Sequence, residues 1–351
     1  MLEDEIKKEI KKCSRCALCV QNCPIFNVKK DENNTSRGLI CKLSGFEKGI
    51  LSEEDIKKDF KICLNCSKCK QNCPSKVDTV KIFTYKNAQF FPSLLNQKMV
   101  LFLKFLPIKF LYFLNLFKKI NFKAKKNDEK ILYFKGCMAQ SQHKISYLDK
   151  NFAKGDFSCC GLPYLTSGDL KSYNKVKEKN IKLIKSASKV VFDCASCISA
   201  VREYPELDEV EKEKLVFFVD LIDEKTISKL KLKKNSKYKN KTTTFHKPCH
   251  MSNSEFFEIE NILKNIKGIN YKRLENYDSC CGFGGSYFIF HPIISTLISL
   301  KKMKTIKKSC ADLVLTSCPA CTLGLRYGQI ISFNFKKTLE LRDFIEKELE
   351  I

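Results

Sequence analysis

The sequence lacks the motifs of several common protein classes. No Gly-x-Gly-x-x-Gly joins a strand-like segment to a helix, and no other phosphate-binding loop is present, so we expect no flavin or nicotinamide site on this chain. No uncharged apolar run reaches the roughly 18 to 20 residues that a membrane-spanning helix needs. The N-terminal segment is charged and has no apolar core, which predicts no secretory signal and a cytoplasmic protein.

Arginine and histidine are scarce. Lys and Arg together number 64 against 39 acids, a formal charge of +25, but the only arginines are Arg15, Arg37, Arg202, Arg273, Arg326 and Arg342. The lysines are scattered along the chain, which predicts a solvated surface and no nucleic-acid partner. The four histidines are His143, His246, His250 and His291. His246 and His250 flank Cys249, and we favour structural hydrogen bonding for them over proton transfer or tuning of a metal centre.

Cysteine, in contrast, is abundant. The 351 residues include 20 cysteines, and the chain is too long for a small module held together by disulfides. In a reducing compartment, cysteines at this density are expected to be metal ligands or redox centres. They fall in three blocks: nine in residues 1–89, none in 90–126, five in 127–228 and six in 242–351. We take these four ranges as the domain organisation, and the basic run 229–241 predicts a surface linker.

Residues 1–89 contain one cysteine run twice. Cys-x-x-Cys-x-x-Cys-x-x-x-Cys-Pro begins at Cys13 and again at Cys63. This is the bacterial ferredoxin spacing, in which three thiolates of one run and the fourth of the other hold each [4Fe-4S] cluster. A zinc site would need two separated Cys-x-x-Cys pairs around one ion. The spacing therefore predicts a two-cluster ferredoxin-type domain, with one cluster on Cys13, Cys16, Cys19 and Cys73 and the other on Cys63, Cys66, Cys69 and Cys23.

The two later blocks share a five-cysteine pattern. In each, one cysteine follows a strand-like run, a Cys-Cys-Gly comes next, and a Cys-x-x-Cys ends the pattern. The first set is Cys137, Cys159, Cys160, Cys194 and Cys197, and the second is Cys249, Cys280, Cys281, Cys318 and Cys321. Repetition favours metal ligation over buried structural cysteines, and five thiols exceed what one ordinary cube needs. Cys41 and Cys310 are left without a predicted role.

The later blocks alternate short apolar runs with helical patterns. The runs Ile131–Phe134, Val190–Phe192, Leu215–Val219, Thr243–Phe245 and Leu313–Leu315 predict buried strands, and Tyr173–Ala187, Ser254–Lys267 and Ile293–Lys307 predict helices. This alternation is typical of α/β layers with parallel sheets, whose ligands lie at the strand ends. The predicted fold class is a multidomain α+β protein: a helical ferredoxin-type domain followed by two duplicated α/β domains.

The cysteine-free segment 90–126 has a different character. Met99–Phe117 is very apolar but is interrupted by Lys104, Pro107 and Lys109, and clustered lysines follow it. Two short amphipathic helices broken at Pro107 fit this pattern. Two alternatives stay open: a helix lying in the membrane surface, which would make the protein peripheral on the inner face of the cytoplasmic membrane, or an interdomain helix pair.

These motifs together resemble the glycolate oxidase iron–sulfur subunit family. The resemblance is carried by the two ferredoxin runs and by Ser36-Arg37-Gly38, Phe134-Lys-Gly-Cys137, Cys159-Cys-Gly, His246-Lys-Pro-Cys249-His250, Cys280-Cys-Gly-Phe-Gly-Gly and Leu339-Glu-Leu-Arg-Asp-Phe-Ile345. It covers nearly the whole chain except about 90–126. The later blocks look like the paired cysteine-rich "CCG" domains, which also occur in heterodisulfide reductase, the lactate-utilisation iron–sulfur protein and anaerobic glycerol-3-phosphate dehydrogenase.

The resemblance implies an oxidoreductase subunit with two [4Fe-4S] clusters and one or two noncubane-type clusters in the CCG domains. Such a subunit would pass electrons from a flavoprotein partner, which oxidises a small 2-hydroxy acid such as glycolate or lactate, towards a membrane quinone. Two departures matter: 21 residues separate Cys137 from Cys159 against 30 between Cys249 and Cys280, and Cys318-Pro-Ala-Cys321 is closer to heterodisulfide reductase. The alternatives are therefore a catalytic subunit that cleaves disulfides, or the small subunit of a glycerol-3-phosphate or succinate dehydrogenase. No catalytic residue is assigned.

Overall fold

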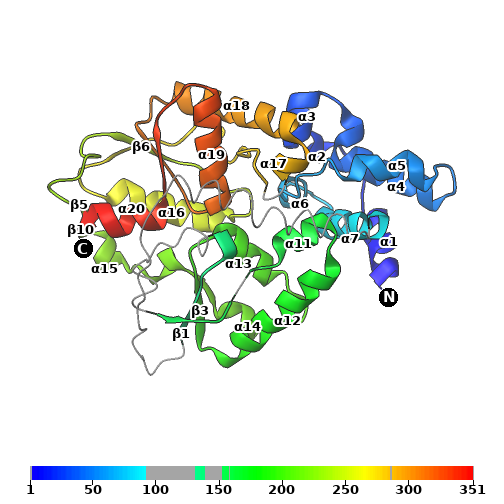
Figure 1. Ribbon diagram of the computed structural model, residues 1–351, viewed down its shortest axis with the longest axis horizontal. Coiled ribbons are helices and arrows are strands. Elements are labelled where there is room, and N and C mark those ends of the chain that lie inside the picture. The colour runs from blue at the N-terminus through cyan, green and yellow to red at the C-terminus, as the bar shows by residue number, and fades with distance from the viewer. Residues whose placement is uncertain (1, 92–130, 139–151, 158, 285–286, 351) are drawn as a thin grey trace.

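The computed structural model describes residues 2–91, 131–138, 152–157, 159–284 and 287–350 (Figure 1). The segment 99–117, for which a membrane-surface helix was one expectation, lies outside these residues. Within the described residues, no helix combines the length and the apolar character that crossing a membrane requires. Figure 1 shows the ferredoxin-type part in blue and cyan beside two sheet-containing parts, one green and one yellow to red.

The ferredoxin-type part is helical. Its elements are α1 (Leu2–Lys11), α2 (Leu18–Gln21), α3 (Pro24–Lys29), the 3-10 helix η1 (Glu32–Asn34), α4 (Ser36–Glu47), α5 (Glu53–Phe60), α6 (Lys68–Gln71) and α7 (Thr79–Phe90). Apolar side chains of the longer helices form their own core, in which Phe60 packs edge-to-face against Phe83 and Phe90. The short helices α2 and α6 lie one in each cysteine run and pack against each other. The core thus holds the two runs side by side.

The first CCG domain contains a parallel four-stranded sheet of order β2-β1-β3-β4. Its elements are β1 (Ile131–Phe134), β2 (Ala153–Lys154), α11 (Leu162–Ser167), α12 (Leu170–Ser186), β3 (Lys189–Phe192), α13 (Ala195–Arg202), α14 (Glu209–Glu213), β4 (Leu215–Phe217), the 3-10 helix η2 (Phe218–Leu221) and α15 (Glu224–Ile227). Phe134 packs between Phe157 and Phe192, with both ring centroids 4.7 Å away. These aromatic contacts fix the ends of β1 and β3, after which the cysteines follow.

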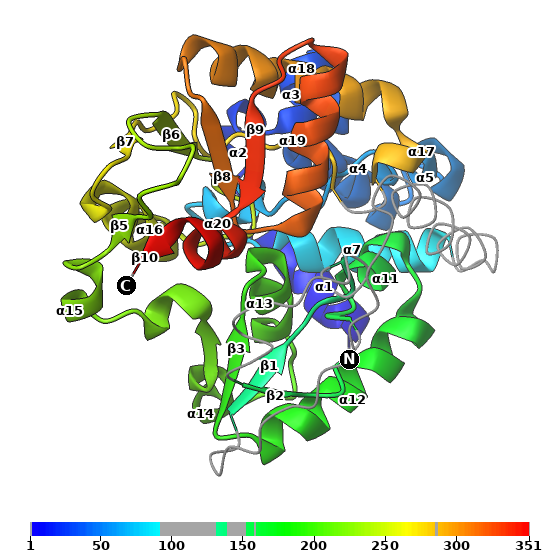
Figure 2. The ribbon, with the colours of Figure 1, turned by 60° about the vertical axis from the view of Figure 1, so that its left-hand side comes forward.

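The second CCG domain repeats this arrangement with a sheet of order β7-β6-β8-β9 (Figure 2). Its elements are β6 (Thr242–Phe245), α16 (Asn253–Asn265), β7 (Asn270–Tyr271), α17 (Tyr287–Phe290), α18 (Pro292–Lys308), β8 (Leu313–Thr316), α19 (Pro319–Ile331), β9 (Lys337–Glu340) and α20 (Leu341–Glu348). In both sheets the first strand lies between the second and the third. The predictions of duplicated parallel α/β domains and of their central strands are confirmed.

The predicted linker 229–241 is more ordered than its composition indicated. Two of its residues form β5 (Lys231–Leu232), which pairs antiparallel with β10 (Leu349–Glu350). Leu230, Leu232 and Tyr238 are buried in the common core. Most lysines of the run are exposed, as a surface linker requires, and its few apolar residues anchor it to the core.

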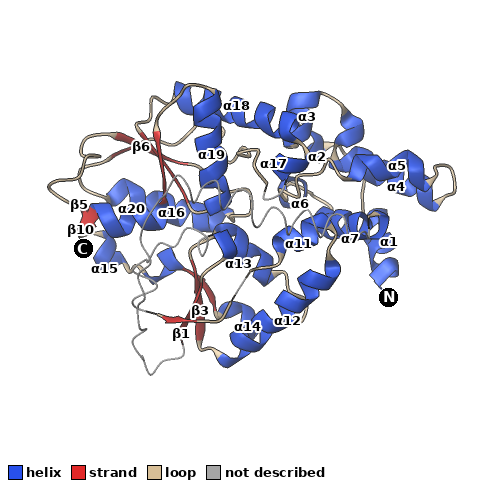
Figure 3. Cartoon of the chain, viewed as in Figure 1, coloured by secondary structure: helices blue, strands red, loops and turns tan. Residues whose placement is uncertain are grey.

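The three parts pack together (Figure 3). Buried hydrophobic side chains of both sheets form one continuous cluster, so the two CCG domains share a core. The ferredoxin-type part contacts both domains, through α7 against α11 and through α3 against α18. A small apolar cluster, which includes Ile25, Leu64 and Tyr287, fills the second of these interfaces. The second ferredoxin run and the second CCG domain consequently lie against each other.

Candidate iron–sulfur sites

The two ferredoxin runs have the same unusual backbone. Arg15 and Ala17 in the first run, and Asn65 and Ser67 at the equivalent positions of the second, all have φ between 49° and 65°. Non-glycine residues rarely adopt this left-handed conformation, and each one costs about 1–3 kcal/mol. Its recurrence at matching positions indicates that each run is wrapped into the same tight loop, with its cysteines turned to one side.

The fourth cysteine of each run lies with the opposite run. Cys23 lines one cavity together with Cys63, Cys66 and Cys69, which are the first three cysteines of the second run. The turn that follows Cys73 reaches the first run, where the hydroxyl groups of Ser75 and Ser14 lie 3.4 Å apart. The structure therefore brings Cys23 to the predicted partners, and it places the Cys73 turn beside the first run.

The ferredoxin thiols differ in their surroundings. Cys16 is exposed, and a backbone hydrogen bond from Leu18, with a contribution from Arg37, lowers its pKa, whereas other thiols are sheltered. Burial raises the pKa of Cys66 well above its usual range, with neighbouring cysteines adding to the effect. Burial raises the pKa of Cys19 to about 11, and the nearby Cys69 contributes. Thiols crowded in this way need a bound positive charge to stay ionised, which a metal ion supplies. All twenty cysteines are free, so disulfides do not account for the crowding.

Each CCG domain gathers its five predicted cysteines at the carboxyl edge of its sheet. In the first domain the sulfur atoms of Cys137 and Cys159 lie 3.6 Å apart, and hydrogen-bonding contacts continue from Cys159 through Cys160 and Cys197 to Cys194. In the second domain the sulfur atoms of Cys281 and Cys321 lie 3.5 Å apart. The contacts run in the same order, Cys249, Cys280, Cys281, Cys321 and Cys318.

The backbone explains why these thiols converge. Cys194 and Cys318 end β3 and β8 and directly precede α13 and α19, whose N-terminal ends favour a negative thiolate. The glycines of the two Cys-Cys-Gly motifs, Gly161 and Gly282, have φ of 79° and 85°. A Cβ atom on Gly282 would lie 2.6 Å from the Ser295 carbonyl oxygen. Glycine is therefore required for the turn that points both adjacent cysteines into the site.

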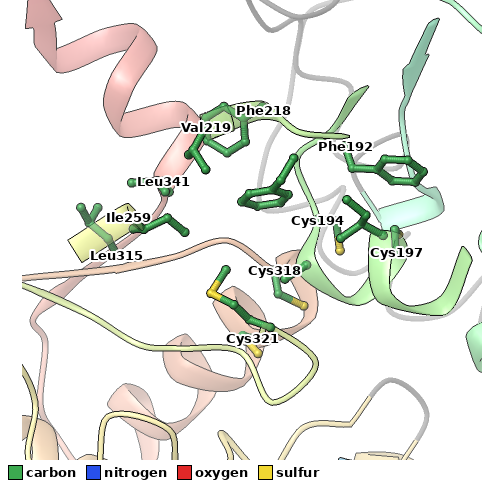
Figure 4. Close-up of a cluster of buried hydrophobic side chains, with 14 of the residues drawn as sticks. Phe192, Cys194, Cys197, Phe218, Val219, Ile259, Leu315, Cys318, Cys321 and Leu341 are labelled. Atoms are coloured by element: carbon green, nitrogen blue, oxygen red, sulfur yellow. The ribbon is translucent and has the colours of Figure 1, made fainter. Parts of the chain in front are cut away.

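The two CCG sites meet each other at Cys194 and Cys318. These thiols are in hydrogen-bonding contact, and Ser196 of α13 lies 3.4 Å from the Cys318 sulfur. Figure 4 shows Cys194 and Cys197 beside α13 and Cys318 and Cys321 beside α19, between the two sheets. Ten thiols thus form a continuous row through both domains. Sequence reasoning did not predict this contact, because it depends on how the domains dock.

The second CCG site also meets the ferredoxin-type part. Cys249 and Cys280 lie close enough to Cys66 to raise the pKa of that thiol. His250, next to Cys249, has its Nε2 3.0 Å from the Asn65 carbonyl oxygen and its Nδ1 3.2 Å from the Ser196 hydroxyl. His250 therefore contacts all three parts of the molecule, and its structural hydrogen bonds agree with the role that the sequence favoured.

A buried arginine locks the domains together beside the first CCG site. Arg342 of α20 forms an ion pair with Asp193, which comes directly before Cys194. The Tyr133 hydroxyl donates to the same carboxylate at 2.7 Å. Although burial disfavours its charge, Asp193 raises the pKa of Arg342. Sequence reasoning left Asp193 unassigned, and its position before a predicted ligand cysteine was the only indication.

The donor chemistry fits iron–sulfur groups. Soft thiolate sulfur is the usual ligand of such clusters, and both CCG sites and both ferredoxin loops present several thiols to one space. Among the described residues, no Asp or Glu lines the cavity around Cys23 and Cys63, whereas magnesium and calcium usually bind carboxylate oxygens. The fold and the thiol groups together define an iron–sulfur protein built from a ferredoxin-type domain and two CCG domains.

Comparisons with known proteins agree. The family model of the cysteine-rich CCG domain matches residues 131–202 and 243–326, and that of a 4Fe-4S dicluster domain matches 9–77. The chain is 31% identical over 192 residues to lactate utilization protein A of Shouchella clausii, which covers 52% of this chain and 79% of that protein. The chain therefore belongs to the family of CCG-domain iron–sulfur proteins that includes lactate utilization protein A.

Two further proteins are similar over comparable lengths. One subunit of the CoM/CoB fumarate reductase of Methanothermobacter marburgensis is 29% identical over 48% of this chain, which spans only 34% of that protein. One subunit of the dihydromethanophenazine:CoB–CoM heterodisulfide reductase of Methanosarcina acetivorans is 27% identical over 61% of this chain and 57% of that protein. Both are subunits of oxidoreductases, and this chain is an iron–sulfur electron-transfer protein related to them.

Proposed function

We propose that this protein is the electron-transfer subunit of a dehydrogenase complex and holds four iron–sulfur groups. In this proposal Cys13, Cys16, Cys19 and Cys73 hold one [4Fe-4S] cluster, and Cys63, Cys66, Cys69 and Cys23 hold the other. The two CCG sets of five cysteines each hold a further, noncubane-type group. Such groups, when bound, take up and release single electrons.

The observation that carries the proposal is the continuous sequence of thiols. It leads from the second ferredoxin run through Cys66 to Cys249 and Cys280, and then past Cys318 to Cys194 in the first CCG domain. The protein contributes the short spacing, the exclusion of water around buried sulfur atoms and the rigid docking of the three parts. This arrangement suits transfer between sites on one chain better than a single isolated catalytic centre.

The electron donor we propose is a flavoprotein partner that oxidises a small 2-hydroxy acid, lactate or glycolate. Lactate utilization protein A, the relative with the highest identity given above, carries lactate in its name, and that supports lactate as the first substrate to test. A flavin converts a two-electron oxidation into single electrons, which iron–sulfur groups accept. The proposed acceptor is a membrane quinone, reached from the inner face of the cytoplasmic membrane.

Purification of the tagged protein from its native cells under anaerobic conditions tests this function. We expect a flavoprotein to co-purify, and one of lactate, glycolate or glycerol-3-phosphate to bleach both the flavin and the iron–sulfur absorbance. In a Cys66→Ser variant the flavin should still bleach while the CCG groups stay oxidised. Cys41→Ser, on α4 outside the thiol groups, is the matched control. A wild-type preparation in which every substrate leaves the iron–sulfur absorbance unchanged would overturn the proposal.

A second candidate function is disulfide reduction at the CCG sites. The paired Cys-x-x-Cys thiols of both domains meet at Cys194 and Cys318, and one of the relatives belongs to a heterodisulfide reductase. If this function is correct, the protein alone should reduce a disulfide to two thiols with reduced viologen as the electron donor. The Cys281→Ala variant should lack this activity. Absence of turnover by the iron-loaded wild type would exclude it.

A further inference from the structure

His246 is buried without a hydrogen-bond partner for its ring. Its side chain is fully inaccessible to solvent, and neither Nδ1 nor Nε2 has a partner among the residues that the structure describes. Leaving a buried polar group unsatisfied costs about 1–3 kcal/mol. The ring is therefore expected to have a partner that is not a protein side chain or carbonyl group.

The backbone of His246 is firmly placed. It follows β6, and its N–H donates to the Leu315 carbonyl oxygen of β8 at 2.8 Å. This bond continues the sheet ladder by one residue and fixes the histidine at the carboxyl edge, where the cysteines of the second CCG site lie. The position of the His246 main chain is thus set by the sheet.

The ring points at two of the predicted ligand cysteines. A nitrogen of His246 and the sulfur atoms of Cys281 and Cys321 all lie within 4.8 Å of one another, and all three residues are buried. With metal–sulfur bonds of about 2.3 Å and metal–nitrogen bonds of about 2.0–2.1 Å, ligand atoms of one tetrahedral ion lie roughly 3.5–4 Å apart. The trio therefore has nearly the spacing of three ligands around one metal ion.

We propose that His246 is a nitrogen ligand of the iron–sulfur group in the second CCG site, bound to an iron that Cys281 and Cys321 also hold. The inference rests on the proposed function in one respect, that this domain contains such a group. A neutral imidazole keeps a lone pair on one nitrogen and is a common iron ligand. Coordination would satisfy one of the two ring nitrogens that have no partner among the described residues.

The first CCG site has no imidazole at the equivalent position. Phe134 and Phe245 end the equivalent strands β1 and β6, so Lys135 occupies the position of His246. A lysine ammonium group has no lone pair with which to bind a metal. The two sites therefore differ in their donors: five thiols in the first, and five thiols with one imidazole in the second.

Pulsed electron paramagnetic resonance on the full-length, anaerobically prepared protein tests the inference. The protein is grown once with natural-abundance histidine and once with ¹⁵N-histidine, and is titrated so that each group is recorded in its paramagnetic state. With only four histidines in the chain, the label is selective. We expect a directly coordinated nitrogen coupling in one group, which changes from ¹⁴N to ¹⁵N on labelling.

Two variants assign the coupling. The His246→Gln variant should lack the nitrogen coupling. The His250→Gln variant should retain it, because the ring nitrogens of His250 have protein partners. Loss in His250→Gln instead would overturn the proposal. If His246→Gln fails to fold, the labelled wild type and His250→Gln still decide, because an absent coupling in the wild type overturns the inference.

Iron analysis separates this inference from the proposed function. Wild-type protein should contain more iron than Cys281→Ser. The difference should equal the amount of iron that the second CCG site holds. An iron-containing site without nitrogen coupling would leave the proposed function standing and remove only the role of His246. Equal iron in the wild type and Cys281→Ser would instead contradict the proposed function itself.

Discussion

The first CCG domain places Lys135 where the second places His246, and Ser196 where the second places Ala320. Two residues after the last strand of the sheet, the first domain has Val219 and the second has Arg342. Around these positions the sheets and the order of the five thiols are the same. Duplication has therefore kept the framework of sheet and thiols, and the differences lie in the side chains that surround it.

These differences show that the two CCG domains depend on each other unequally. Arg342 of the second domain reaches Asp193 of the first, and Val219 can return no such ion pair. Ser196 of the first domain reaches Cys318 of the second, and Ala320 has no hydroxyl with which to contact Cys194. The first domain thus contacts the second site through the Ser196 hydroxyl group, while the second domain contributes the Arg342 ion pair to the first domain.

The largest expected effect is the loss of one whole metal group. Cys281→Ser should remove the iron of the second CCG site, and Cys160→Ser, its counterpart, should remove that of the first, because each serine replaces a central thiol of one row. Iron content per chain and electron paramagnetic resonance spectra measure both. If either variant loses the iron of both sites, the thiol row is one shared centre and the comparison of two sites fails.

Removal of the interdomain arginine should have the next largest effect. Arg342→Leu leaves Asp193 buried without its ion-pair partner, and breaking such a pair destabilises a protein by about 3–5 kcal/mol. The free energy of unfolding in urea, followed by circular dichroism, measures the change. Lys57→Ala, which removes the partner of Glu53 on an exposed helix face, is the control, with at most about 1 kcal/mol expected. Equal losses in the two variants would show that Arg342 does not lock the domains.

Ser196→Ala should have the smallest effect on stability. It removes the hydroxyl that contacts Cys318 and His250, for a loss of about 1 kcal/mol in the free energy of unfolding. The midpoint potential of the second CCG group should shift, while that of the first stays unchanged. A redox titration followed by paramagnetic resonance measures both, and Ala320→Ser is the mirror variant. Equal shifts of the two groups would contradict the unequal dependence.

Much of the fold follows from local sequence patterns. The central strands of each sheet are apolar on both faces, so Ile131–Phe134 and Leu313–Leu315 were recognisable as buried strands. The strands β2, β7 and β9 were not predicted, because edge strands are short or only half-buried and carry weak apolar patterns. Three long helices of the CCG domains, α12, α16 and α18, were predicted, since their apolar faces repeat over several turns, whereas α19 was not.

The site was predictable in its members but not in its connections. Cysteine spacing alone indicated the four thiol sets, because ligand spacing within a loop is a local property. The contacts Cys194 with Cys318, Cys66 with Cys249, and Asp193 with Arg342 join distant parts of the chain and depend on docking. For His246 the sequence favoured a structural hydrogen bond, and no such bond is found among the described residues, which is what led to its assignment as a ligand.

The pairing of β5 with β10 has a consequence for the order of assembly. These two short strands bring Leu232 and Leu349 together, and the entire second CCG domain lies between them along the chain. During synthesis β5 can pair with β10 only after residues 349–350 have left the ribosome. In the same way, Asp193 can form its ion pair only after Arg342 has been synthesised. The ferredoxin-type helices can fold much earlier, because their contacts are local in sequence. Iron delivery to newly made copies of this protein should therefore begin at the ferredoxin runs, and both CCG sites should be completed only after residues 349–350 have been synthesised.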